Sequence, residues 1–306
     1  MDTLQISSTG RGINYVPEYH ADATGKFAAV GLEVIAKPQD PWELVLSDLA
    51  SDASDVVLGG LWVPALYAGS DRELTAIGQI NARFPMAIVT RDPIAGFTWA
   101  DLAGKTVLAP GVGGTAPYEF TAGVIRAAGG LPAGVRFMRD LSTPMMYELW
   151  GNGTGDAFIA DPLTAQKIVA AGTGSISLRL AEVGGVMPNS VYYVKRSRIP
   201  ELRDRLERFI GVVGTSMRSL DAGHDVDGAA ATAERLIPGA APAVLRAAID
   251  DMIATDVWSS SRIERSASEN WTAILHEAGL LPQPVSHEQI VDDSIVEAVE
   301  QAQQVA

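Results

Sequence analysis

Short apolar runs alternate with amphipathic stretches from the N-terminus to about Arg198. Apolar runs bounded by glycine, proline or aspartate are typical of strands buried on both faces. They predict strands at 4–9, 32–36, 55–58, 74–80, 87–90, 106–109, 135–138, 157–160, 176–180 and 191–194. Helical periodicity falls between several of them, at 17–30, 41–49, 116–128, 144–150 and 163–171. This alternation indicates an α/β fold with largely parallel sheets.

After Arg198 the pattern becomes helical throughout. Helices are predicted at 200–220, 226–236, 243–254, 268–277 and 288–305. Pro17 suits the first turn of its helix, and Asp40 is expected to be the N-cap of the next one. We expect two α/β halves side by side, with the chain crossing between them near 83–90 and again near 187–195. The late helices would then complete the first half.

Composition and net charge argue against several classes of function. The 306 residues carry a net charge of −14, which disfavours nucleic-acid binding because phosphate neutralisation needs clustered lysine and arginine. The chain has no cysteine, so disulfides, thiolate nucleophiles and cysteine-ligated metals are excluded. The four histidines are scattered without metal-ligand spacing, and no cofactor is predicted.

No targeting or membrane segment is predicted. The first residues lack a basic start and a long apolar run, and no stretch approaches the ~20 apolar residues that span a bilayer. We therefore expect either a cytoplasmic protein, or an extracytoplasmic one whose leader has been removed.

A glycine-rich loop follows the strand at 106–109 and precedes a helix. Its sequence Gly111-Val-Gly113-Gly114-Thr115 offers backbone amides and a helix dipole to a small anion or polar ligand. The same residues, continued to Ala116, match a dinucleotide fingerprint, and a plain tight turn is a third interpretation. No P-loop lysine follows the glycines, so a nucleotide P-loop is excluded.

Other candidate binding residues lie near predicted strand ends and crossovers. Gly60 lets the backbone approach a ligand, and Trp62 could stack on one or be a core aromatic. Tyr19 near the first helix start and Asn81 at the first crossover are further candidates. Asp161 ends a strand, where it could pair with a ligand or cap the next helix. No Ser-His-Asp order, G-x-S-x-G or paired-carboxylate motif is present, so no catalytic residue is predicted.

Several motifs, taken together, resemble the NMT1/THI5-like (SsuA-like) solute-binding proteins of ABC transporters. The motifs occur in the same order as in that family and extend along nearly the whole chain. Their combination, rather than any single motif, carries the resemblance. They are Pro17-x-Tyr19-x-Ala21 with Gly25, Phe27 and Gly31-Leu-Glu-Val34, then Asp55-Val-Val-Leu-Gly59, Asp101-Leu-Ala-Gly-Lys-Thr-Val107, Gly155-Asp-Ala-Phe-Ile-Ala-Asp-Pro162 and Val291-Asp-Asp-Ser-Ile-Val-Glu-Ala298.

The resemblance implies a two-lobed type II periplasmic-binding-protein-like fold with a ligand cleft between its lobes. Lobe 1 would comprise 1–86 and 192–306, and lobe 2 would comprise 87–191. The implied function is capture of a small anionic or aromatic/heterocyclic solute, of the sulfonate, nitrate or pyrimidine-precursor class, for an ABC permease partner. The ligand-binding residues implied are Thr9, Tyr19, Gly60, Trp62, Asn81, Gly113, Gly114, Thr115 and Asp161.

An enzymatic alternative comes from the same resemblance. Some relatives, of the pyrimidine-synthase and desulfinase types, act on small aromatic or heterocyclic substrates and use cysteine motifs. Tyr15 occupies the region of the desulfinase cysteine here, and the chain has no cysteine to form either motif. We therefore expect a binding protein rather than an enzyme.

Overall fold

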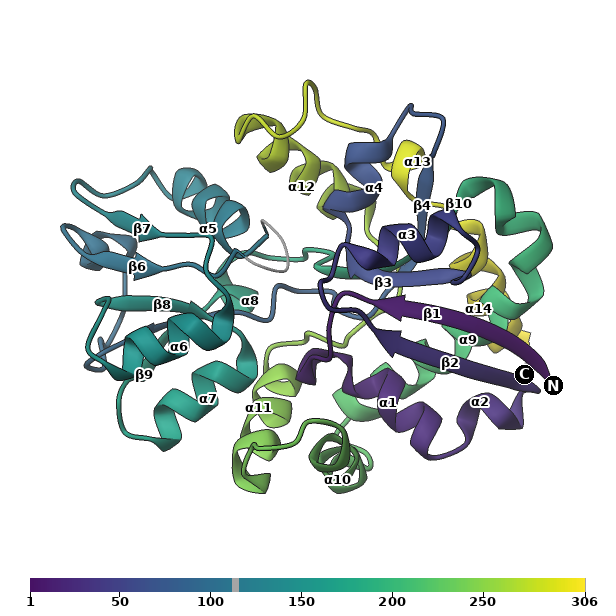
Figure 1. Cartoon of the computed structure of the whole chain (residues 1–306), viewed down its shortest axis with the longest axis horizontal. Coiled ribbons are helices and arrows are strands. Elements are labelled where there is room, and N and C mark those ends of the chain that lie inside the picture. The colour runs from purple at the N-terminus through teal and green to yellow at the C-terminus, as the bar shows by residue number, and fades with distance from the viewer. Residues whose placement is uncertain (112–115, 306) are drawn as a thin grey trace.

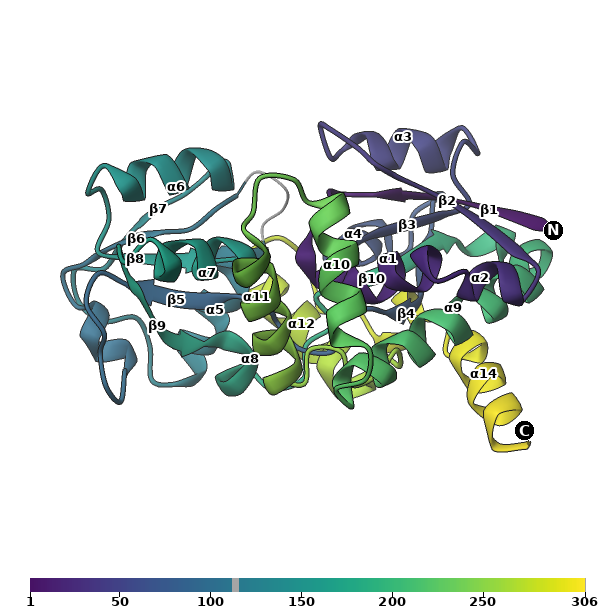
Figure 2. The same ribbon diagram turned by 90° about the horizontal axis from the view of Figure 1, so that it is seen from below.

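Among the described residues, two five-stranded β-sheets organise the fold (Figure 1). The computed structural model describes residues 1–111 and 116–305, with helices packed around both sheets (Figure 2). The predicted two-lobed α/β architecture is confirmed. No described helix is long and apolar enough to cross a membrane.

The first sheet has the strand order β2-β1-β3-β10-β4. β1 pairs in parallel with β2 and β3, whereas β10 runs antiparallel to β3 and β4. The strands are β1 (Asp2–Ser8), β2 (Leu32–Pro38), β3 (Val56–Gly60), β4 (Leu74–Gln79) and β10 (Ser190–Lys195).

The second sheet has the order β7-β6-β8-β5-β9. β6 pairs in parallel with β7 and β8, and β5 runs antiparallel to β8 and β9. The strands are β5 (Ala87–Thr90), β6 (Thr106–Leu108), β7 (Arg136–Met138), β8 (Ala157–Ala160) and β9 (Ser175–Arg179). The chain thus passes between the sheets before β5 and again before β10; the boundaries at 86/87 and 191/192 stay a prediction.

The helices cover both sheets. Those that precede β10 are α1 (Val16–Ala23), α2 (Lys26–Ala29), α3 (Leu44–Ala50), α4 (Trp62–Tyr67), α5 (Ala116–Ala127), α6 (Thr143–Gly151), α7 (Pro162–Ala170) and α8 (Leu180–Val183). The C-terminal third holds α9 (Ile199–Asp221), α10 (Val226–Leu236), α11 (Pro242–Ala254), α12 (Arg265–Glu277), α13 (His287–Ile290) and α14 (Ser294–Val305). Short 3-10 helices are η1 (Ile13–Tyr15), η2 (Trp99–Leu102) and η3 (Arg196–Arg198).

Three helix predictions were wrong in detail. The helix expected at 17–30 is divided into α1 and α2 at Gly25, whose φ of 71° is a left-handed conformation that glycine adopts without steric cost. The helix expected at 288–305 is divided where Val291 pairs with Ala76 of β4. Asp40 is not an N-cap, because α3 begins only at Leu44.

The hydrophobic core is not divided into one separate cluster for each sheet. One cluster packs β1 and β3 against α1, α9 and α11, and another lies on the α6–α7 side of the second sheet. A third cluster spans both sheets, from Val57 of β3 to Ile88 of β5. At its centre Phe84 packs on Phe120, with ring centroids 4.5 Å apart, and Phe120 meets Trp271 of α12. Burying each such side chain contributes roughly 1.5–3 kcal/mol, so this cluster stabilises the fold around the first crossover.

The C-terminal helices also bridge the two sheets. α11 packs against α7, and α12 packs against α5 (Figures 1 and 2). An ion pair accompanies each contact, Arg179 with Asp251 and Arg126 with Glu277. The helices that complete the first half therefore contact the second half in this conformation.

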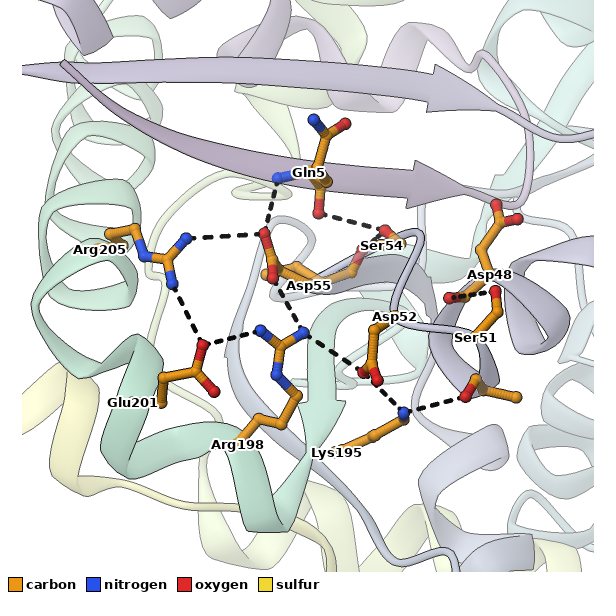
Figure 3. Close-up of polar contacts among 12 residues, drawn as sticks. Gln5, Asp48, Ser51, Asp52, Ser54, Asp55, Lys195, Arg198, Glu201 and Arg205 are labelled. Atoms are coloured by element: carbon orange, nitrogen blue, oxygen red, sulfur yellow. Dashed lines mark hydrogen bonds and ion pairs between the residues drawn. The ribbon is translucent and has the colours of Figure 1, made fainter.

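A polar network fixes the start of β3 to α9 (Figure 3). The Asp55 carboxylate accepts a hydrogen bond from the Gln5 amide at 3.0 Å and pairs with Arg198 at 3.0 Å. Lys195, at the end of β10, pairs with Asp52 at 2.8 Å. The aspartate of the motif at 55–59 is therefore structural: it joins two strands to the helix that follows the second crossover.

Candidate functional site

The carboxyl ends of β1 and β3 bring Thr9 and the glycine pair together. The Thr9 amide donates to the Leu58 carbonyl at 3.0 Å. Gly60 lies under the Trp62 ring, where an added Cβ would be 2.4 Å from Cδ1 of that ring. Glycine at position 60 thus lets Trp62 fold back over the strand end. Ligands of open α/β folds bind at this edge of the sheet.

A polar layer lies beside these strand ends. The Tyr15 hydroxyl is 3.3 Å from the Ser190 hydroxyl at the start of β10. Asn81 is fully buried; its Oδ1 accepts from Asn14 at 2.8 Å and its Nδ2 donates back to the Asn14 carbonyl at 3.0 Å. Asn81 therefore positions η1 in this conformation, and a direct role in ligand binding stays a prediction.

Tyr193 of β10 adds a polar atom that the sequence did not signal. Its hydroxyl is buried and has no hydrogen-bond partner among the described residues. A Cβ on Gly59 would meet this hydroxyl at 3.3 Å and the Thr9 methyl at 3.0 Å, so the three residues are neighbours. A buried hydroxyl without a hydrogen-bond partner costs roughly 1–3 kcal/mol of stability.

A cavity of about 450 Å³ lies between the two sheets, and we call it the cleft pocket. Its walls include Trp42, Glu43 and Trp62 from the first half, Gly111, Tyr118, Arg139 and Asp140 from the second, and Leu275 of α12 with Leu280 just beyond that helix. Trp42 and Trp62 pack edge to face, with ring centroids 5.4 Å apart. The volume falls within the range of ordinary small-molecule sites.

Arg139 provides the positive charge of the cleft pocket, whose lining also holds the acids Glu43 and Asp140. It directly follows β7, and its guanidinium carbon lies 3.7 Å from the centroid of the Tyr118 ring. Its Nη2 pairs at 3.2 Å with Glu119, whose side chain is 8% exposed. The guanidinium is thereby held over an aromatic ring, which suits it to pair with an anionic group of a ligand.

Not every predicted site residue lines the cleft pocket. Trp62 does, whereas Tyr19 lines a separate cavity beside α1. Asp161 caps α7: its Oδ1 accepts from the amides of Leu163 and Thr164, both at 3.0 Å. Capping was the alternative interpretation of Asp161, and a ligand contact there stays a prediction.

The glycine-rich loop was the strongest candidate for an anion site in the sequence, and only its start is described. Gly113, Gly114 and Thr115 lie outside the described residues. Gly111, directly before them, lines the cleft pocket.

Sequence reasoning missed Trp42, Tyr118 and Arg139. Arg139 could have been found as a charged residue directly after a strand of a parallel pair. A larger cavity of about 770 Å³ lies between α3 and the start of β4, lined by residues such as Tyr67 and Lys195. We favour the cleft pocket because it lies at the strand carboxyl ends and takes walls from both halves of the chain.

Comparisons with known proteins agree with this architecture. No family model matches the chain. YtlA, a protein of Bacillus subtilis (strain 168) named as a candidate binding protein, is 21% identical over 97% of this chain and 89% of its own length. The chain also resembles a solved alkanesulfonate-binding protein SsuA from Xanthomonas axonopodis pv. citri bound to MOPS (TM-score 0.73, 16% identity, 96% and 99% of the two chains).

Two further solved structures similar to this chain differ from each other in function. One is the periplasmic nitrate-binding protein NrtA from Synechocystis PCC 6803 (TM-score 0.75, 13% identity, 100% and 90% of the two chains). The other is the desulfurization enzyme DSZB (TM-score 0.66, 14% identity, 99% and 100% of the two chains). The resemblance to SsuA-like proteins is thus confirmed at the level of the fold, which solved binding proteins and an enzyme share.

Proposed function

We propose that the chain is a solute-binding protein that captures a small anionic molecule with an aromatic or heterocyclic body in the cleft pocket. The observation that carries this proposal is a cavity walled by both halves, with tryptophans on one side and Arg139 stacked on Tyr118 on the other. Ring stacking would hold the body of the ligand, and the guanidinium would pair with its acid group.

The proposed partner is an ABC permease, and the proposed location is outside the cytoplasm. The partner is supported by the fold shared with a ligand-binding component of an ABC-type import system, and the location by the fold shared with a periplasmic nitrate-binding protein. Opening and closing of the two lobes around the ligand would present different surfaces to such a permease.

The enzymatic alternative is favoured by one comparison, the fold shared with DSZB. It predicts conversion of a bound aromatic substrate without a cysteine, since the chain has none. A binding protein would instead return its ligand unchanged.

A thermal-shift screen followed by mass spectrometry separates the two functions. The probes are MOPS, nitrate, benzenesulfonate, benzoate and nicotinate. A ligand at 100-fold its Kd should stabilise the protein by about 2.7 kcal/mol. Recovery of the unchanged probe supports solute binding, whereas a changed mass supports the enzyme.

A matched pair of variants tests the site. Arg139→Gln should weaken binding of the best probe at least tenfold. Arg136→Gln, at the opposite end of β7, should leave it unchanged, because Arg136 does not line the cleft pocket. Equal effects of the two variants, or no stabilisation by any probe, would count against the proposal.

A further inference from the structure

Glu18 of α1 is a buried acid with a single protein partner. The residue is 3% exposed, and one carboxylate oxygen accepts a hydrogen bond from the fully buried Tyr192 hydroxyl at 2.6 Å. No other hydrogen bond reaches this carboxyl from the described residues. A carboxylate has room for about four hydrogen bonds, so most of its capacity is unused.

Glu18 lines a cavity of about 390 Å³, which we call the α1 pocket. The walls come from β2, α1 and α10, and Tyr19, Phe27 and Val34 give it an apolar lining. It shares no lining residue with the cleft pocket. The α1 pocket is therefore a second cavity, formed within the half of the chain that contains the first sheet.

The other charged groups of the α1 pocket are exposed. They are Arg11, Asp22 and Arg235. Each arginine keeps its charge and hydrogen-bonds to a neutral acceptor: Arg11 donates to the Leu236 carbonyl at 3.3 Å, and Arg235 donates to the Thr232 hydroxyl at 3.2 Å. Exposed charges interact weakly through water, so the desolvated carboxyl of Glu18 dominates recognition in this cavity.

Burial raises the pKa of Glu18 to about 7, with the Tyr192 hydrogen bond opposing the rise and Asp22 adding to it. The carboxyl is therefore about half protonated near neutral pH. A cation placed beside it would favour the ionised form and gain a charge-assisted hydrogen bond in a low-dielectric site.

We propose that the α1 pocket binds a small primary amine with an apolar body. The ammonium group would donate to the Glu18 carboxylate, and the body would pack on Tyr19, Phe27 and Val34. This site goes beyond the proposed function, because it lies apart from the cleft pocket and takes a ligand of opposite charge.

Isothermal titration calorimetry at pH 7.5 tests the proposal, with 2-phenylethylamine as the probe and 2-phenylethanol as its uncharged counterpart. The amine should bind at least tenfold more tightly than the alcohol. Glu18→Gln should remove this preference, since the amide keeps its bond from Tyr192 but carries no charge. Glu148→Gln on α6, remote from the cavity, is the matched control and should keep the preference.

Two further variants make the result decisive. Ala36→Phe fills the α1 pocket from β2 and should abolish amine binding even if Glu18→Gln folds poorly. Arg139→Gln in the cleft pocket should leave amine binding unchanged. The proposal is overturned if the amine and the alcohol bind equally or not at all, or if amine binding depends on Arg139 rather than on position 18 or 36.

Discussion

The cleft pocket and the α1 pocket differ in the burial and pairing of their charged residues. Arg139 keeps an exposed edge, stacks on Tyr118 and has Glu119 as its counter-ion. Glu18 is almost fully buried, and among the described residues its hydrogen-bond partner is the neutral phenol of Tyr192. A paired, half-exposed charge costs little to keep, whereas an unpaired buried charge is expensive. The two pockets should therefore respond very differently to pH and to mutation.

They also differ in how they are assembled. The walls of the cleft pocket come from both halves of the chain, so its shape depends on how the halves sit together. The walls of the α1 pocket come from neighbouring elements around the first sheet, so it is preformed. Preformed sites lose less free energy to ordering when a ligand binds.

The largest expected effect is a change in the free energy of unfolding with pH that is caused by the titration of Glu18. Its pKa rises from 4.5 to about 7 on folding. The unfolded chain therefore loses this proton first, and the free energy of unfolding should fall between about pH 4.5 and pH 7 and level off above. The loss should be roughly 3 kcal/mol, at 1.36 kcal/mol for each pKa unit.

Urea unfolding of wild type and Glu18→Gln at pH 5, 6, 7 and 8 measures this difference. The variant should gain stability relative to wild type as pH rises, because glutamine does not titrate. Glu148→Gln should follow the wild-type profile. A constant difference between wild type and Glu18→Gln across this pH range would show that Glu18 is not a desolvated acid.

The next effect concerns the ion pair of the cleft pocket. Arg139→Ala removes the partner of Glu119, whose residue is 6% exposed, and should destabilise the protein by roughly 1–3 kcal/mol. Adding Glu119→Gln should restore part of that loss, since no buried charge then remains. Urea unfolding of the single and double variants gives the coupling free energy; strictly additive effects would mean that the pair contributes nothing.

The strands were predictable because two-sided burial makes each one a continuous apolar run. The prediction at 87–90 coincides with β5, and that at 106–109 exceeds β6 by one residue. Helix ends were harder, since the break at Gly25 depends on a backbone conformation that helical periodicity does not report. The short helix α4, which begins at Trp62, was missed because the glycine pair before it was interpreted as a place where the backbone approaches a ligand.

The candidate site was only partly predictable. Gly60 and Trp62 could be named because a glycine pair follows a strand. Arg139 and Trp42 lie far apart in the sequence, and only the packing of the two halves brings them to one cavity. Glu18 sits between a proline and a tyrosine in a helix, and no local pattern shows that its carboxyl faces inward.

The smallest effect tests whether the two pockets differ in their dependence on the lobes. Asp251 of α11 pairs with Arg179 of β9 and so links the C-terminal helices to the second sheet. Both side chains are partly exposed, so Asp251→Asn should cost at most about 1 kcal/mol. A loss of about 1 kcal/mol shifts an equilibrium between closed and open lobes about fivefold towards the open state. Small-angle scattering should show a larger radius of gyration for the ligand-free variant. Asp250→Asn, which breaks the pair with Arg246 inside α11, should leave the radius of gyration unchanged.

Asp251→Asn should also weaken binding of the best cleft-pocket probe, while binding of 2-phenylethylamine should stay as in wild type. Weaker binding of both ligands would mean that the α1 pocket, too, depends on how the lobes are joined.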